Sequence, residues 1–324
     1  MTMRFTFLPL LLAGFTFAAA GANAEPTGVP GTHFGSQAVL ERCWSPEERL
    51  GRPEDRRPPQ GPSDRSSLSA VRLRPGTTLP PLRADWRYSI RRVELQDRGR
   101  PVALTFDLCE TAGARTGYDA AVVNVLRRHT AAATFFAGGK WMQTHAERAK
   151  QLMADPLFEI GNHTWTHPNC AHMEGTRILD QVVRTQAQYE SLRKELSESP
   201  CVKELGPSEM EKIPRVPCVF RFPYGACSGD ALRIVAEAGL AAIQWDVVMG
   251  DPVPAQNVSA MVDRVLGKVR PGSIIVGHAN GRNYGTAEAL EVILPQLAAR
   301  GFHFVRVSEL LLLGRVVTSQ ECHD

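Results

Sequence analysis

The sequence predicts an α/β fold, in which a parallel β-sheet is covered by helices and curls into a closed or nearly closed barrel. From residue 100 of this 324-residue chain onwards, short apolar runs alternate with longer amphipathic stretches. Apolar strands that alternate with helices are typical of parallel sheets, because both faces of such a sheet are buried. Seven such runs favour a barrel over an open sheet, although periodicity alone leaves that choice open.

The short apolar runs are the predicted strands, and the stretches with apolar residues at helical spacing are the predicted helices. The strands are residues 102–107, 132–139, 158–164, 219–225, 241–247, 273–279 and 302–307. The helices are residues 118–129, 176–196, 230–239, 258–269 and 287–301. The last two helices end near Gly or Pro, as helices commonly do.

Residues 1–24 have the features of a secretory signal peptide. Arg4 precedes an apolar run, and small residues lead to Ala22-Asn23-Ala24, which is an A-x-A cleavage site. A membrane anchor is the less favoured alternative, because the apolar run is short. No other stretch of the sequence is long and apolar enough to span a bilayer. We therefore expect an exported protein, periplasmic or secreted, without stable membrane insertion.

The remainder of the chain divides by composition. Residues 25–98 are rich in Pro, Arg and Ser, which indicates a flexible or extended segment, with one further strand possible within residues 85–95. Residues 99–313 are the predicted main domain, and residues 314–324 are a C-terminal tail. The formal net charge is only +3, so composition gives no indication of nucleic-acid binding. The oligomeric state is not predicted.

Seven cysteines lie beyond the predicted cleavage site, and in an oxidising compartment most should form disulfides. The odd number leaves at least one cysteine unpaired within the chain. Cys201 and Cys218 lie at either side of a Pro-containing segment, so we expect them to pair. A bridge between Cys109 and Cys170 is a second, less favoured expectation.

Charged or titratable side chains follow five of the seven predicted strands. In parallel α/β barrels the active site collects at the carboxyl ends of the strands, so we expect these side chains to converge. They are Asp107, Glu110, His163, His167, Arg221, Tyr224, Asp246, Asp251 and His278.

His163 and His167 are the most informative of these residues. At the spacing i, i+4, side chains on one helical turn have Cβ atoms about 5–6 Å apart, which suits a zinc-type ion. Structural hydrogen-bonding histidines are an equally favoured alternative. Arg221 within an apolar run requires a carboxylate partner unless it reaches solvent. His278 ends an apolar run, where it either titrates near neutral pH or is a satisfied core histidine.

The order of these motifs resembles the carbohydrate esterase family 4 deacetylases, also called NodB-homology polysaccharide deacetylases. That family has the motifs T-F-D-D, H-[ST]-x-x-H, R-x-P-Y, D-x-x-D and an apolar run ending in His. This chain has TFDL, HTWTH, RFPY, WDVVMGDP and IIVGH in the same order. The resemblance implies a distorted (β/α) barrel with about seven strands over residues 99–313. It also implies removal of acetyl groups from an N-acetylated polysaccharide or oligosaccharide.

The resemblance further implies a divalent metal, usually Zn²⁺, bound by His163 and His167. Asp107 would be the general base for a metal-bound water, held and polarised by Arg221. The sequence departs from the family at Leu108, because the family has its third ligand, an aspartate, at that position.

For the remaining site residues the resemblance implies roles late in the reaction. The backbone N–H of Tyr224 would stabilise the oxyanion. His278 would be the general acid, supported by Asp246 or Asp251, since Val248 replaces an aspartate expected between them.

Three residues next to Leu108 are candidates for the third ligand. Strand alternation sends Asp107 and Cys109 to one side and Leu108 to the other. Our preferred hypothesis keeps Asp107 as the base and makes Glu110 the third ligand, bound directly or through a water, since an oxidising compartment favours a disulfide at Cys109. Two alternatives stay open. Glu110 lies at the surface beside a weak site of two histidines, or Asp107 is the ligand and Glu110 is the base.

Two further functions remain open as alternatives. Leu108 favours a non-catalytic glycan-binding relative that has lost the metal site. A deacetylase acting on O-acetyl esters is the other.

Overall fold

The computed structural model describes residues 34–60, 74–96, 99–254 and 257–322. The predicted signal peptide lies outside these residues. Within them, no helix combines the length and the apolar character that crossing a bilayer requires.

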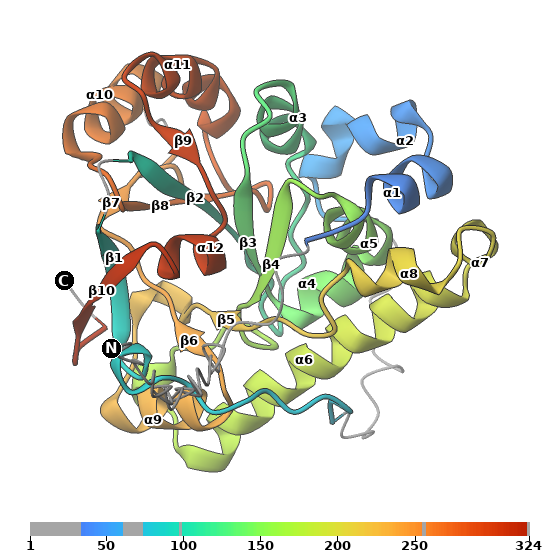
Figure 1. Ribbon diagram of the computed structural model, residues 1–324, viewed down its shortest axis with the longest axis horizontal. Coiled ribbons are helices and arrows are strands. Elements are labelled where there is room, and N and C mark those ends of the chain that lie inside the picture. Colours follow the sequence, from blue (N-terminus) through green and yellow to red (C-terminus); the bar gives the residue numbers. More distant parts are fainter. Residues whose placement is uncertain (1–33, 61–73, 97–98, 255–256, 323–324) are drawn as a thin grey trace, which may run out of the picture.

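A curled sheet of parallel strands forms the centre of the molecule (Figure 1). Its strand order is β6-β5-β4-β3-β2-β8-β7, and β9 pairs with β2. Every residue of the central strand β2 is buried, as expected for a parallel strand covered on both faces. The predicted α/β barrel of about seven parallel strands is therefore confirmed. The strands are β2 (Pro101–Leu108), β3 (Ala133–Ala137), β4 (Phe158–Asn162), β5 (Val219–Phe220), β6 (Ala241–Ala242), β7 (Val247–Val248), β8 (Ile274–His278) and β9 (His303–Phe304).

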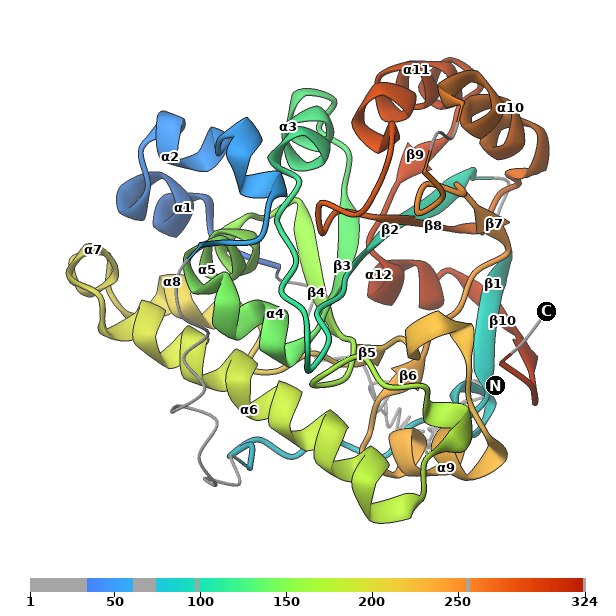
Figure 2. The same ribbon diagram turned by 180° about the vertical axis from the view of Figure 1, so that it is seen from behind.

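Helices surround this sheet on its outside (Figures 1 and 2). The five predicted helices are present as α3 (Ala120–Arg128), α6 (Gly175–Glu198), α9 (Gly229–Glu237), α10 (Val258–Lys268) and α11 (Thr286–Ala299). Side chains of Asp119, Ser228 and Asn257 cap the first backbone N–H groups of α3, α9 and α10. The helices not predicted include α4 (Gly139–Thr144), α5 (Ala146–Ala154) and α12 (Val307–Leu311).

Three predicted strands, residues 219–225, 241–247 and 302–307, are much shorter in the structure, where β5, β6 and β9 have two residues each. Pro223 has no N–H for a β-ladder, and Tyr224 has a left-handed backbone with φ of 60°. The pairing of β5 therefore ends just where the chain turns into the predicted active site.

The strand β1 (Ser89–Leu95) lies across the gap between the two edges of the curled sheet. The carbonyl of Ile90 accepts a hydrogen bond from Gln244 N–H after β6, and Val93 N–H donates to the Gly272 carbonyl before β8. Along its other side β1 pairs antiparallel with β10 (Gly314–Ser319). Segments from both ends of the described chain thus close the barrel.

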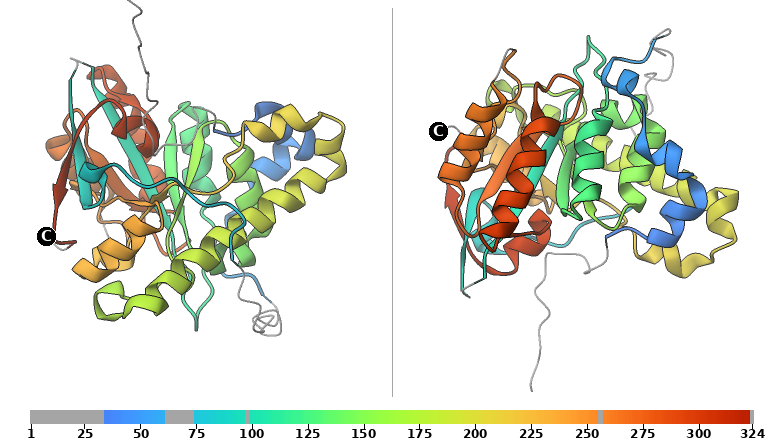
Figure 3. Two further views of the ribbon diagram at one scale, coloured as in Figure 1. Left: turned by 60° about the horizontal axis from the view of Figure 1, so that its bottom comes forward. Right: turned by 90° about the horizontal axis from the view of Figure 1, so that it is seen from above.

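The prediction of a flexible segment at residues 25–98 is wrong for much of its described part. Helix α1 (Gln37–Cys43) places Val39 and Leu40 in the main hydrophobic core, and Trp44 follows them. Figure 3 shows α1 and the following helix α2 (Pro46–Leu50) against the body of the protein. Helix α1 has only seven residues, which is too short to give a clear periodicity in the sequence.

Both predicted disulfides are also wrong. Cys43 is bonded to Cys201, and Cys227 is bonded to Cys322. Cys109, Cys170 and Cys218 are free. Cys201 lies in α7 (Pro200–Lys203), which follows the long helix α6 away from the sheet, whereas Cys218 directly precedes β5. Proximity in the sequence therefore did not bring the two sulfurs together.

Disruption of the Cys43–Cys201 bridge should destabilise the protein without altering the site. We expect Cys43→Ser together with Cys201→Ser to lower the free energy of unfolding by about 2–4 kcal/mol, because the unfolded chain loses a long covalent loop. Denaturant titration measures this change, and Cys218→Ser, which removes a free thiol, is the matched control. A non-reduced digest that links Cys201 to Cys218 would contradict the structure.

Candidate active site

A cavity of about 540 Å³ opens at the carboxyl ends of β2 and β8. It brings together five of the predicted site residues. These are Asp107, His167, Tyr224, Asp251 and His278. Part of the wall is apolar and includes Trp245, Val248 and Val253. The predicted convergence at the strand ends is therefore present for these five residues.

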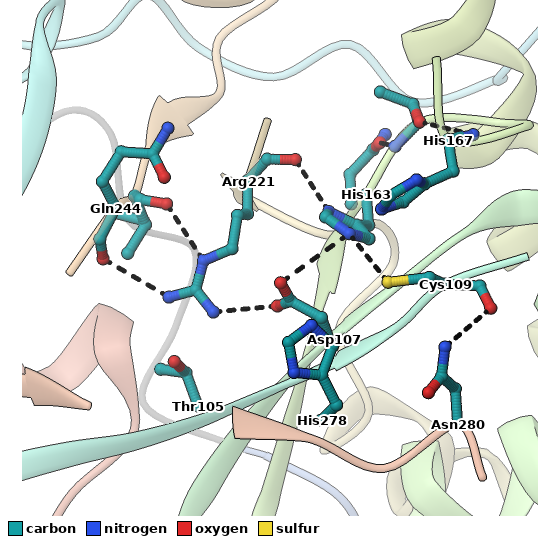
Figure 4. A network of polar contacts seen from close by, with 12 residues as sticks. Thr105, Asp107, Cys109, His163, His167, Arg221, Gln244, His278 and Asn280 are labelled. Atoms are coloured by element: carbon teal, nitrogen blue, oxygen red, sulfur yellow. Dashed lines mark hydrogen bonds and ion pairs between the residues drawn. The ribbon is translucent and has the colours of Figure 1, made fainter. Parts of the chain in front are cut away.

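Arg221 is fully buried beneath this cavity and holds Asp107 in place. Its Nη1 donates to Asp107 Oδ1 at 2.8 Å, while Nε and Nη2 donate to the carbonyls of Ile243 and Gln244 at 3.2 and 3.3 Å (Figure 4). Burial raises the pKa of Asp107, but the Arg221 charge and nearby histidines outweigh it, and the net pKa is lowered. Asp107 is therefore a carboxylate at neutral pH.

His163 is held by the same arginine through its backbone. A carbonyl can only accept, so His163 Nδ1 donates to the Arg221 carbonyl at 2.9 Å and Nε2 keeps a free lone pair. This Nε2 lies 3.8 Å from Asp107 Oδ2 and 3.5 Å from Cys109 Sγ. Burial is the main reason that the pKa of His163 is lowered, which favours the neutral imidazole that metals bind.

His167 approaches His163 through a loop and not along a helical turn, as the i, i+4 argument assumed. Thr164 and His167 both have a left-handed backbone, with φ of 65° and 54°, and the two imidazole centres lie 5.0 Å apart. Such conformations cost about 1–3 kcal/mol each and are concentrated at functional sites. Burial, followed by the charge of His163, lowers the pKa of His167 to about 3. Its Nδ1 is buried and has no hydrogen-bond partner among the described residues.

Cys109, His163 and His167 form the group of side chains that could hold a metal ion. Their ligand atoms all lie within 4.8 Å of one another. One sulfur and two imidazole nitrogens are a donor set that suits Zn²⁺. The fixed tautomer of His163 and the unpartnered Nδ1 of His167 are further features that fit a metal site.

Glu110, the preferred third ligand, is not part of this group. Its carboxylate is buried and accepts from Thr144 Oγ1 at 2.7 Å and from Thr116 N–H at 3.4 Å. The chain leaves β2 after Leu108, and the loop directs the Glu110 carboxylate to Thr144 and Thr116 and not to the histidines. Burial raises the pKa of Glu110, and the structure gives it a role in holding the loop after β2.

His278 is paired with Asp251. Its Nδ1 lies 2.9 Å from Asp251 Oδ1, and its backbone N–H donates to Asp251 Oδ2 at 2.7 Å. Thr286 Oγ1 also donates to this carboxylate, at 2.8 Å. Burial lowers the pKa of His278, but the Asp251 hydrogen bond and charge outweigh it, so that the net pKa is raised.

Asp246 is not brought to the site. Its carboxylate accepts from Ser273 Oγ at 2.9 Å and from Ile274 N–H at 2.9 Å, at the amino end of β8. The site lies at the carboxyl end of that strand. Of the two aspartates considered as the partner of His278, Asp251 alone occupies that place.

Cys109 is a candidate ligand in the sequence for which a disulfide is the favoured expectation, but in the structure its thiol is free. Asn280 and Thr116 are not among the predicted site residues. The Cys109 carbonyl accepts from Thr116 Oγ1 at 2.7 Å and from Asn280 Nδ2 at 3.1 Å. The sequence did indicate the direction of the Cys109 side chain, because strand alternation places it on the same side as Asp107. No sequence pattern pointed to the other two residues.

Comparison with known proteins supports the family that the motifs suggest. Residues 95–200 match the polysaccharide deacetylase family. A chitooligosaccharide deacetylase from Bradyrhizobium sp. is 30% identical over 224 residues, which cover 65% of this chain and 90% of that protein. A peptidoglycan-N-acetylglucosamine deacetylase from Bacillus cereus is 30% identical over 213 residues, which cover 64% of this chain and 67% of that protein.

Solved structures with the same fold include a mutant of a family 4 carbohydrate esterase pseudoenzyme from Bacillus anthracis. It is 25% identical to this chain, with a TM-score of 0.56, and the match covers 70% of this chain and 72% of that chain. These sequence and structural similarities confirm the expectation drawn from the five motifs. The chain belongs to the polysaccharide deacetylases of carbohydrate esterase family 4, a family of hydrolases acting on carbon–nitrogen bonds other than peptide bonds.

Proposed function

We propose that this protein is a metal-dependent deacetylase that removes N-acetyl groups from a glycan, such as peptidoglycan, a chitin-like polymer or an exopolysaccharide. One observation carries the proposal. Asp107 lies between His163 and His278 (Figure 4), and Asp251 Oδ1 lies 2.9 Å from His278 Nδ1. A base, a candidate metal ligand and a candidate acid are therefore in one place.

The chemistry begins at the amide carbonyl. A divalent ion at His163 and His167, which we propose to be Zn²⁺, would polarise the acetyl carbonyl and lower the pKa of an attacking water from about 15.7 towards about 7. Asp107 accepts the proton of that water, and it can do so because Arg221 keeps it ionised and oriented. The ring of Tyr224 lies beside His167, with the two ring centres 4.5 Å apart. The backbone N–H of Tyr224 donates to the oxyanion.

Collapse of the tetrahedral intermediate requires a proton on the leaving nitrogen. His278 donates it from Nε2, because Nδ1 is engaged with Asp251. Acetate and a free amino sugar are the products. Asp251 fixes the ring orientation of His278 and stabilises its protonated form.

Export is part of the proposal. Two disulfides are compatible with an oxidising compartment, either the periplasm or the medium. We retain residues 99–313 as the deacetylase domain and residues 1–24 as the signal peptide. The substrate partner is an N-acetylated polysaccharide or oligosaccharide.

A non-catalytic glycan-binding role is the second candidate. Leu108 at the position of a family ligand favours it, as does the structural similarity to a pseudoenzyme. The presence of Asp107, Arg221 and His278 in one hydrogen-bonded site favours catalysis instead.

Acetate release decides between these functions. We expect the purified protein to release acetate from N-acetylated chitooligosaccharide or peptidoglycan fragments, to stop when a chelator is added, and to recover with Zn²⁺. Acetylated xylan in the same panel tests O-acetyl esters. Folded, metal-loaded protein that releases no acetate from any of these substrates would support the non-catalytic role.

Loss of Arg221 should remove both stability and activity. We expect Arg221→Met to lower the free energy of unfolding by about 3–5 kcal/mol, because Asp107 is left buried and unpaired. The matched control is the double variant Arg221→Met with Asp107→Leu, which should recover most of the stability and none of the activity. Denaturant titration and acetate assays measure the two effects, and an Arg221→Met variant as stable as the parent would contradict this role.

His278 should behave as a general acid. We expect His278→Ala to lower turnover by a factor of about 10²–10⁴ with normal metal content. Turnover should fall as pH rises through the raised pKa of His278, because only the protonated form donates. Asp251→Asn removes the interaction that raises this pKa, so the fall should move to lower pH. Loss of bound metal in His278→Ala would show instead that His278 is a metal ligand.

A further inference from the structure

We propose that the Cys109 thiolate is the third protein ligand of the metal, so that this chain uses a Cys-His-His site where the family has an aspartate. The inference rests on the metal dependence proposed above, and it concerns which atoms complete the site. Leu108 removes the family's carboxylate, and the structure places a different donor beside the two histidines.

The distances between the donor atoms agree with a single shared ion. Cys109 Sγ lies 3.5 Å from His163 Nε2. Zn–S and Zn–N bonds of about 2.3 and 2.0–2.1 Å, at tetrahedral angles, place sulfur and nitrogen about 3.5 Å apart. A thiol hydrogen bond to imidazole has a similar length, so the next observations are needed to separate the two.

The backbone of Cys109 is held on both sides. Its carbonyl accepts from Thr116 and Asn280, and the preceding Leu108 is buried in the hydrophobic core. Glu110 is buried on the other side of the chain, where its carboxylate accepts a hydrogen bond from Thr144. Turning this segment to bring Glu110 to the histidines would expose Leu108, because neighbouring residues alternate between the two sides.

No other described group competes for this sulfur. Cys109 is free, and the thiol of Cys170 is directed to the Pro168 carbonyl at 3.7 Å. Asp107 is the remaining alternative ligand, since its Oδ2 lies 3.8 Å from His163 Nε2. Its other oxygen is bound by Arg221, and this arrangement suits a base better than a ligand.

A thiolate ligand gives the site its own chemical preference. Sulfur favours Zn²⁺ and other thiophilic ions over Mg²⁺, Ca²⁺ and Mn²⁺, which prefer oxygen. A bound ion would also engage the sulfur, which lines the cavity.

Cobalt substitution of the full mature chain tests this proposal by spectroscopy. Co²⁺ bound by a thiolate gives a near-ultraviolet charge-transfer band, which carboxylate and imidazole ligands do not give. We expect this band in the parent protein and in the matched thiol control Cys218→Ser, and its loss in Cys109→Ser. Zn²⁺ affinity should fall at least about 100-fold in Cys109→Ser, since even residues that only support a ligand cost 10–100-fold.

Cys109→Asp separates ligation from folding. A carboxylate at this position should keep Co²⁺ bound, as judged by the visible ligand-field bands, without the near-ultraviolet band. Parent protein that binds Co²⁺ without the charge-transfer band would overturn the thiolate ligand, and uptake of no metal at all would overturn the metal site with it. A protein with the band that releases no acetate would leave the ligand in place and refute the proposed catalysis.

Discussion

The buried guanidinium of Arg221 is the group on which the rest of the site depends. Burying a charge costs several kcal/mol unless its partners are well placed. Here Asp107 and two carbonyls satisfy it, and the rings of Phe136 and Trp245 lie 4.1 and 5.4 Å from its carbon. The carbonyl of the same residue accepts a hydrogen bond from the Nδ1–H of His163. One residue thus fixes the ionisation of Asp107, the proposed base, and the tautomer of His163, a candidate ligand.

The sequence predicted most of the fold because apolar periodicity is a local property. The strands β2, β3, β4 and β8 begin and end within a few residues of the predicted runs. Three runs were predicted too long. In residues 219–225 the strand ends before Pro223 and the left-handed Tyr224, and residues 241–247 and 302–307 keep only the two-residue strands β6 and β9. The closing pair β1 and β10 could not be predicted as a pair, since local patterns contain no information about which distant strand a segment meets.

The sequence predicted which residues lie at the site better than it predicted which partner each of them contacts. Strand ends identified His163, Arg221 and His278, and alternation gave Cys109 the correct side of β2. The expectation of a disulfide at Cys109 followed from the rule that an oxidising compartment pairs thiols. That rule is true on average, but Cys109 is free in the structure. Cys201 does form a disulfide, but its partner was wrongly predicted, because that partner is 158 residues away in the sequence.

The strand β1 has a consequence for how the chain reaches this structure. It pairs with a strand at the far end of the sequence, so that Ser89 lies opposite Ser319. Contacts between residues so distant in sequence are slow to form, because a large loop must close before they contribute. Until β10 has been synthesised, β1 has no outer neighbour and the gap in the sheet is incompletely covered. Barrel closure should therefore be among the last steps of folding, and an incomplete chain would present an open sheet edge on which aggregation can begin.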